Sequence, residues 1–332
     1  MLSIGPMDPS LGNNEEDPMT RRFTVILALG LAVLTACPAV ALEPRAKAKA
    51  QRPSLPEGVT IERDLAYGPH KERNTLDLYL PTEGEAPRPL VIWIHGGAWR
   101  GGSKDGGPQP AMQLPRRGYA VASINYRLSQ HAPFPAQIED CKAAVRFLRA
   151  NASRYGLDPD HFGAWGGSAG GHLVALLGTS GDVKDLEGDG PNPGVSSRVQ
   201  AVCDIFGPAN LLTMAAQSGP DSTIQHDAPD SPGSLLLGGP IPDRKDAARR
   251  ASPVTYITRD DPPFLIIHGD KDTTVPVGQS RELHAALQKG GVDSTLMIVP
   301  GAGHGPEILT PEVLRAAVTF FDKHLKHGTA ER

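Results

Sequence analysis

From about residue 59 onward, apolar residues occur in short blocks that alternate with amphipathic segments. The block 90–94 (LVIWI) is apolar throughout, which is typical of a strand buried on both faces of a parallel sheet. In segment 136–151 the apolar positions recur at helical spacing and therefore share one face. The whole pattern predicts strands over 59–67, 74–80, 90–94, 119–126, 161–166, 199–206, 264–268 and 295–299, and helices over 136–151, 169–179, 277–288 and 311–324.

This alternation predicts an α/β fold, with a mostly parallel central sheet and helices on both faces. Segment 207–261 interrupts the rhythm, because it is rich in Pro, Gly, Ser and Asp. A polar insertion of this length between two core strands is typical of a lid over a site. We therefore expect one domain over 59–327 with a lid insertion at 207–261. Its one apolar patch, 235–237, would be a lipid or partner surface if exposed and core if buried.

The first residues carry a targeting pattern rather than a fold pattern. Arg21 and Arg22 precede an apolar run over 23–36, and Ala39-Val40-Ala41 follows it. The run is too short to span a bilayer comfortably, and the A-x-A sequence is typical of signal-peptide cleavage. We expect a signal peptide over 1–41 and a mature chain without a transmembrane span, either secreted or periplasmic.

Two further features belong to this N-terminal region. Met19 is the expected start, since the acidic stretch before it is foreign to signal peptides. Segment 42–58 is basic, Pro-rich and aperiodic, which predicts a flexible leader. A second interpretation stays open, because residues 34–37 (LTAC) resemble a lipoprotein box with Cys37 as the lipidated residue.

Composition excludes several function classes. The 332 residues carry 33 Lys+Arg against 37 Asp+Glu and only 5% aromatic residues, so neither a basic stripe nor a base-stacking platform is expected, and nucleic acid is not an expected partner. Three cysteines without a CxxC spacing form no disulfide framework or structural zinc site. Cys141 and Cys203 would either pair in an oxidising compartment or pack as two small buried residues.

The candidate chemistry begins at a glycine-rich turn. Residues 166–171 (GGSAGG) contain G-x-S-x-G between a predicted strand and a predicted helix, which is the setting of a nucleophile elbow. Ser168 would be exposed at the turn, and the N-terminus of the following helix would favour negative charge beside it. Upstream, residues 95–99 (HGGAW) follow a predicted strand and match the HGGG-type oxyanion motif. The expected oxyanion hole is the N–H of Ala169 with that of Gly97 or Ala98.

An acid and a base follow in the expected order. Strand 264–268 leads into a loop with Asp270 and Asp272, and the last strand leads into His304 within GAGHG. The order Ser, Asp, His is that of α/β-hydrolases. All three positions follow strand ends, where open α/β sheets build their sites.

On these motifs the chain resembles the α/β-hydrolase carboxylesterases, in particular the bifunctional feruloyl/acetyl-xylan esterases (BD-FAE), with features of hormone-sensitive-lipase-like esterases. The resemblance covers about residues 59–327 and rests on WIHGGAW, WGGSAGGH, HGDKDTTVP and GAGHG. Ala98 replaces the third glycine of the lipase-like motif, and a Val-Pro pair follows the acid, which favours the feruloyl/acetyl-xylan branch. The resemblance implies that Asp272, three residues before Val-Pro, is the acid.

The implied function is a secreted serine esterase whose catalytic residues are Ser168, Asp272 and His304. Its substrate would be a carboxylic ester, such as an acetyl or feruloyl ester of a plant polysaccharide, and no metal or organic cofactor would be needed. Two alternatives stay open. One is a peptidase of the prolyl-oligopeptidase type, although no propeller domain precedes the hydrolase. The other is a non-catalytic binding module on the same fold.

Other residues have weaker signals. Trp99 is expected to line the substrate pocket because it lies on the oxyanion loop. His95 is expected to shape that loop rather than act as the base, and His172 to pack within the fold. His226 lies in a polar segment and is expected at the surface. Residues 185–190 (DLEGDG) resemble the front of a calcium loop but lack its glutamate at the twelfth position, so we expect a solvated acidic loop.

Overall fold

A single sheet of eight strands forms the centre of this computed structural model, which describes residues 55–326. The strand order is β1-β2-β4-β3-β5-β6-β7-β8, and β3 to β8 are mutually parallel while β2 runs antiparallel to both neighbours. The strands are β1 (Val59–Ala66), β2 (Thr75–Pro81), β3 (Arg88–Ile94), β4 (Ala120–Ile124), β5 (Leu157–Gly167), β6 (Ala201–Ile205), β7 (Phe264–Gly269) and β8 (Ser294–Val299). This confirms the predicted α/β-hydrolase fold. The predicted signal peptide and Cys37 lie outside the described residues.

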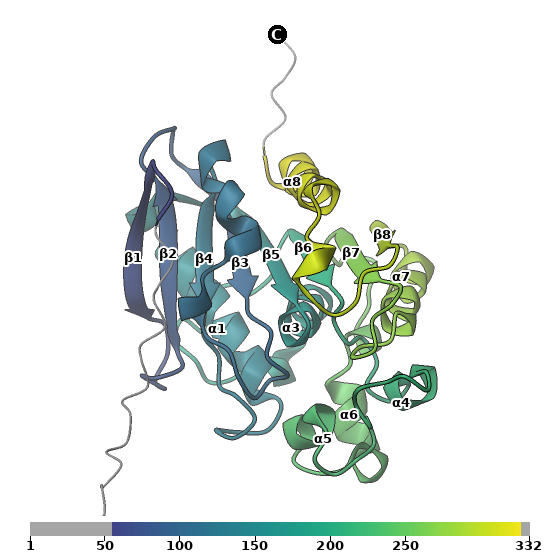
Figure 1. Cartoon of the computed structure of the whole chain (residues 1–332). Helices are drawn as coiled ribbons and strands as arrows, with labels where there is room; N and C mark the ends of the chain where they lie inside the picture. The colour runs from purple at the N-terminus through teal and green to yellow at the C-terminus, as the bar shows by residue number, and fades with distance from the viewer. Residues whose placement is uncertain (1–54, 327–332) are drawn as a thin grey trace, which may run out of the picture. The chain divides into compact units, whose positions relative to one another are not determined.

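After β4, helices alternate with the strands (Figure 1). They are α1 (Ala136–Ala150), α2 (Ala152–Tyr155), α3 (Ala169–Thr179), α4 (Met214–Gln217), α5 (Pro232–Leu237), α6 (Lys245–Arg250), α7 (Gly278–Gly290) and α8 (Pro311–Leu325). The four predicted helices correspond to α1, α3, α7 and α8, with boundaries that differ by at most two residues. Among the described residues, none of these helices is long and apolar enough to cross a membrane.

Two hydrophobic clusters hold the layers together. One cluster includes residues of α1, α3 and α7, and the other includes residues of α8. Cys141 of α1 belongs to the first cluster and Cys203 of β6 to the second. Both thiols are free and buried. The two cysteines are therefore small core residues on different packing surfaces, which agrees with the second of the two expectations.

The insertion predicted as a lid, residues 207–261 (below, the lid insertion), forms short helices between β6 and β7. It contains α4, α5 and α6, which lie together below the sheet in the view of Figure 1, while α8 lies above. In the apolar patch 235–237, Leu236 and Leu237 are buried and only Leu235 is exposed. The patch therefore belongs mainly to the core. Arg249 and Arg250 are exposed at the end of α6, as expected of a solvated charge pair.

Three titratable side chains are buried close to the carboxyl ends of the strands. Burial lowers the pKa of His95 and of His172 to about 4, because the charged imidazolium loses its hydration. Burial raises the pKa of Asp204 to about 7, although the N–H of Gly207 donates to this carboxyl. At neutral pH both histidines are therefore uncharged.

These groups predict a loss of stability in mild acid. Between about pH 6 and 5, unfolding lets two imidazoles take up protons, whereas Asp204 releases one, so the net uptake is about one proton. Through these three groups, the free energy of unfolding should then fall by roughly 1.4 kcal/mol for each unit by which the pH is lowered. Urea unfolding at both pH values measures it.

The Asp204→Asn variant removes the carboxyl whose proton release on unfolding opposes the proton uptake by the two imidazoles. It keeps an acceptor for Gly207 but cannot release a proton, so its free energy of unfolding should depend about twice as steeply on pH as that of the wild type. An unchanged slope in this variant, or a wild-type protein that gains stability on acidification, would contradict the assignment.

Candidate active site

Ser168 stands on a sharp turn between β5 and α3. Its backbone has φ +58° and ψ −122°, a conformation that non-glycine residues rarely adopt. The Ser168 N–H donates to the carbonyl of Ile205 at 2.9 Å, which ties the turn to the end of β6. At Gly170 a β-carbon would lie 2.0 Å from the carbonyl oxygen of Ile94. Glycine at this position therefore lets the first turn of α3 rest directly on the end of β3.

The structure brings Ser168, His304 and Asp272 into one line of hydrogen bonds. Nε2 of His304 lies 2.9 Å from the Ser168 hydroxyl, and Nδ1 of His304 lies 2.6 Å from a carboxylate oxygen of Asp272. Because a carboxylate can only accept, Nδ1 carries the proton and Nε2 is left to accept from the hydroxyl. The three residues are 32 and 136 positions apart in sequence and meet only through the sheet.

Asp272 is held as a carboxylate. Burial raises its pKa, but hydrogen bonds from His268 and His304 and from the Val275 backbone outweigh this effect, and the net pKa lies well below its usual range. One carboxylate oxygen accepts from the N–H groups of Thr274 and Val275, at 2.8 and 2.9 Å. The competing candidate Asp270 instead accepts from the N–H of Gly301. Of the two aspartates, Asp272 is the one that contacts the imidazole.

The loop after β3 approaches the nucleophile turn closely. A β-carbon at Gly96 would lie 2.8 Å from the Gly167 carbonyl oxygen. Gly97, Ala98 and Trp99 all have positive φ, at +113°, +55° and +54°. Ala169 begins α3, and N–H groups in the first turn of a helix have no partner within that helix. The predicted oxyanion residues therefore border Ser168 from two sides.

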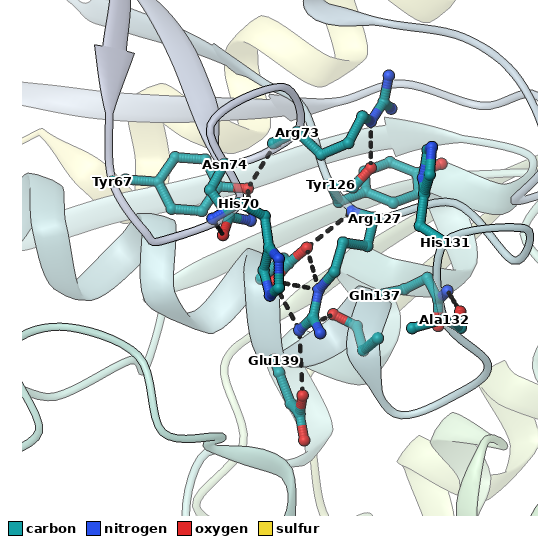
Figure 2. Close-up of polar contacts among 12 residues, drawn as sticks. Tyr67, His70, Arg73, Asn74, Tyr126, Arg127, His131, Ala132, Gln137 and Glu139 are labelled. Atoms are coloured by element: carbon teal, nitrogen blue, oxygen red, sulfur yellow. Dashed lines mark hydrogen bonds and ion pairs between the residues drawn. The ribbon is translucent and has the colours of Figure 1, made fainter.

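A polar network that includes Arg73, Tyr126 and Arg127 (Figure 2) contacts this loop at His95. The Tyr126 hydroxyl donates to the His95 carbonyl at 2.9 Å, and the two rings stack with centroids 4.4 Å apart. Arg73 donates to the carbonyl of Tyr126 at 2.8 Å. Arg127 follows Tyr126 in the chain, and its guanidinium donates to Asp140 and Glu139 of α1. These bonds tie this segment to that helix. His95 thus shapes the loop, as predicted, and carries no charge at neutral pH.

Trp99 and His172 connect three segments around the nucleophile. The indole N–H of Trp99 donates to Nδ1 of His172 at 3.2 Å, and Nε2 of His172 donates to the Ala251 carbonyl at 2.6 Å. Both side chains are buried. A neutral imidazole can accept from Trp99 while donating to Ala251, whereas a charged one could not. His172 is therefore a packed core residue, as expected, and it links α3 to the oxyanion loop and to the end of the lid insertion.

Two cavities meet at Ser168. The smaller has a volume of about 40 Å³ and is walled by Trp99, Ala169 and residues of the lid insertion, among them Met214, His226 and Ile241. The larger has a volume of about 540 Å³ and is lined by His304 and by apolar groups that include Trp93, Phe206, Ile308 and Leu309. Ala98 borders both cavities. Trp99 thus lines a cavity beside Ser168, and its contact with substrate stays a prediction.

Sequence reasoning missed three residues near this site. The expectation that His226 lies at the surface is wrong: the side chain is 6% exposed and lines the smaller cavity, because the lid insertion folds back over Ser168. His268, at the end of β7, lies 3.2 Å from Asp272 and is fully buried. Phe206 packs its ring against His304. Position at the end of a predicted strand was the available signal for His268 and Phe206, whereas nothing in the sequence indicated the burial of His226.

In segment 185–190, Asp185 and Asp189 are exposed, as expected of a solvated acidic loop, whereas Glu187 is partly buried. Glu187 accepts from Lys142 and Arg146, two buried cations of α1, at 2.7 and 2.5 Å. Within residues 55–326, no group of three or more His, Cys, Asp or Glu side chains is placed to hold a metal ion.

Comparisons with known proteins agree with this geometry. Esterase LipQ of Mycobacterium tuberculosis is 33% identical over 251 residues, which cover 73% of this chain and 56% of LipQ. The chain thus spans about half the length of the curated relatives it matches.

Solved structures match over more of their length. A truncated carbohydrate esterase from gut microbiota is 34% identical with a TM-score of 0.72, covering 80% of this chain and 95% of that one. The propionate-bound esterase Est2 of Thermogutta terrifontis is 25% identical with a TM-score of 0.65, covering 82% and 97%. The BD-FAE family model matches residues 76–287, which confirms the resemblance drawn from the motifs. The chain therefore belongs to the BD-FAE family of α/β-hydrolases.

Proposed function

We propose that the protein is a serine esterase that removes a short acyl group, such as acetyl, from a bulky alcohol. The observation that carries this proposal is the line of hydrogen bonds from Ser168 through His304 to Asp272. A serine hydroxyl is a weak nucleophile until an adjacent base accepts its proton. Esterase names among the relatives and solved structures of similar fold support the same reaction class.

The reaction follows from the positions of these groups. As Oγ of Ser168 attacks the ester carbonyl carbon, Nε2 of His304 takes the hydroxyl proton and Asp272 stabilises the resulting imidazolium. The carbonyl oxygen becomes an oxyanion that the N–H groups of Ala169 and of Gly97 or Ala98 stabilise. His304 then gives its proton to the departing alcohol, which leaves an acyl-serine. Water attacks that acyl-serine by the same route, releasing the carboxylic acid and restoring the Ser168 hydroxyl.

The position of His304 indicates which cavity takes the alcohol part of the ester and which takes the acyl part. Because the leaving alcohol oxygen must receive its proton from His304, the alcohol part belongs in the larger cavity, which His304 lines. The acyl part then belongs in the smaller cavity of about 40 Å³. A cavity needs roughly 10–15 Å³ to hold one water molecule, so this cavity holds only a few non-hydrogen atoms. Of the two acyl groups expected from the sequence, this size favours acetyl over feruloyl.

The size of the larger cavity and the similar solved structures together suggest which alcohol the ester contains. The larger cavity has room for a sugar unit, and a carbohydrate esterase is among the similar structures. Est2 of Thermogutta terrifontis has been solved with propionate and with butyrate bound, both of which are short carboxylates. An acetylated plant polysaccharide is therefore the natural substrate class that we propose.

Replacing the nucleophile tests the proposal directly. With p-nitrophenyl esters from acetate to dodecanoate, wild-type kcat/KM should be highest for the shortest chains, and the Ser168→Ala variant should lose roughly 10⁶-fold in kcat. Asp272→Asn should lose roughly 10⁴-fold, because it leaves the imidazole in the wrong tautomer.

Asp270→Asn is the matched control, since Asp270 contacts Gly301 and not the imidazole, and it should keep near-wild-type activity. A folded wild-type protein as inactive as Ser168→Ala would sink the esterase proposal. Prolyl peptide substrates and ligand binding would then test the two alternatives.

Enlarging the smaller cavity should change acyl preference alone. Met214 and Ile241 are buried lining residues, so Met214→Ala and Ile241→Ala should shift the preferred ester toward butanoate and hexanoate by roughly 10-fold in relative kcat/KM. The matched control is Ile308→Ala, because Ile308 is equally apolar and buried but lines the other cavity. If Ile308→Ala lengthens the preferred acyl chain and Ile241→Ala does not, the assignment of the cavities is reversed.

We also propose that the N-terminal segment directs secretion. The mature protein should then begin at Leu42, after cleavage of the A-x-A site. Mass spectrometry of the protein from the culture medium or periplasm measures this. A mature N-terminus at Cys37 that carries lipid would support the lipoprotein interpretation, and an intact N-terminus on protein found in the cytoplasm would contradict both.

A further inference from the structure

Phe206, which follows β6, has a backbone conformation that costs free energy. Its φ is +45°, in a region that large L-residues seldom occupy. Three hydrogen bonds hold the chain there: the Phe206 N–H donates to Ile267 at 2.8 Å, the Gly207 N–H to the Asp204 carboxyl at 2.9 Å, and the Ser168 N–H to Ile205 at 2.9 Å. Strain of this kind persists where the surrounding structure over-determines it, and it often marks a functional position.

The strained backbone aims the Phe206 ring at the proposed general base. Its centroid lies 4.3 Å from that of the His304 imidazole, with 42° between the ring planes. Room for the ring comes from Gly167, where a β-carbon would lie 3.3 Å from the Phe206 ring. Phe206 is half-buried and also lines the larger cavity beside Ser168.

His304 is held by hydrogen bonds at both ring nitrogens. It lies in a loop between Gly303 and Gly305, and its side chain is 17% exposed. Its two ring nitrogens are fixed by Asp272 and Ser168, but these bonds alone allow the imidazole to tilt about the line that joins them. A ring packed on the imidazole face opposes that tilt and keeps water from that side of the hydrogen bonds.

We propose that Phe206 is a positioning residue that holds the His304 imidazole in line with Ser168 and shields that pair from water. This inference rests on the proposed esterase function. Glycine would adopt this backbone conformation without strain. If the position needed only an apolar group to fill space, a leucine could fill similar space, and no aromatic ring would be required. The ring and its direction are what the strained turn provides.

The test separates positioning from simple contact with the alcohol. Phe206→Leu keeps an apolar side chain and removes the ring, whereas Phe206→Tyr keeps the ring. Acetate esters of ethanol and of 2-naphthol are compared, because only the naphthyl group reaches far into the larger cavity. Positioning predicts that Phe206→Leu lowers kcat by roughly 10–100-fold for both esters with little change in KM, and that Phe206→Tyr restores most of the loss.

The control is Phe320→Leu. Phe320 packs against the same hydrophobic cluster and also faces a histidine, His324, at a centroid distance of 4.9 Å, but it lies on α8 and does not line either cavity at Ser168. It should leave kcat unchanged. If Phe206→Leu keeps wild-type kcat, or changes only KM and only for the naphthyl ester, Phe206 is a wall of the alcohol cavity and the proposal is overturned.

A second readout does not require ester hydrolysis. In proton NMR, the His304 Nδ1–H that donates to Asp272 should give a far-downfield resonance in the wild-type protein. Phe206→Leu should broaden that resonance through faster exchange with water, while Phe320→Leu should leave it sharp. If the wild-type protein hydrolyses no ester, the proposed function fails. The positioning role is rejected separately, by a Phe206→Leu resonance as sharp as that of the wild type.

Discussion

The contact between the nucleophile turn and the end of β3 constrains the rest of the site. Gly170 rests on the Ile94 carbonyl, and Gly96 faces the Gly167 carbonyl, at distances that leave no room for side chains. Parallel pairing sets Ile94 opposite Gly166 and Gly167 opposite Ile205, so the ends of three strands stand side by side. Because these backbones touch, the proposed oxyanion N–H groups and Ser168 lie at one point without any long side chain to position them.

The charges around that point are arranged so that a single imidazole is free to exchange a proton. Asp272 is fixed as a carboxylate by N–H donors and by two histidines. His268 is committed to Asp272 and Val275, and His172 to Trp99 and Ala251. Burial keeps His95 and His172 neutral, so neither imidazole adds a positive charge beside the oxyanion loop.

Local pattern was enough to predict the sheet, the main helices and the turns that carry Ser168 and His304, because each of these features leaves a mark on neighbouring residues. The choice of Asp272 over Asp270 came from the family resemblance instead. Apolar blocks of 5–8 residues mark the strands, and glycines beside Ser168 and His304 mark the turns. The roles of His226 and Phe206 leave no such mark. His226 is buried only because the lid insertion folds back over Ser168, and Phe206 meets His304 across nearly a hundred residues of sequence. Contacts of that kind depend on tertiary packing, which periodicity does not encode.

Backbone strain is concentrated at the same place. Among the described residues, the non-glycine positions with positive φ are Asp64, Ala98, Trp99, Ser168, Asn192 and Phe206, and four of these six line a cavity at Ser168. Each such conformation costs free energy that a glycine would avoid. Ser168 is the proposed nucleophile, and Ala98 and Trp99 lie on the loop that the proposed oxyanion hole requires, so strain at these three positions has a proposed purpose. By the same reasoning the strain at Phe206 requires a benefit that only its side chain can supply, and the side chain contacts the imidazole.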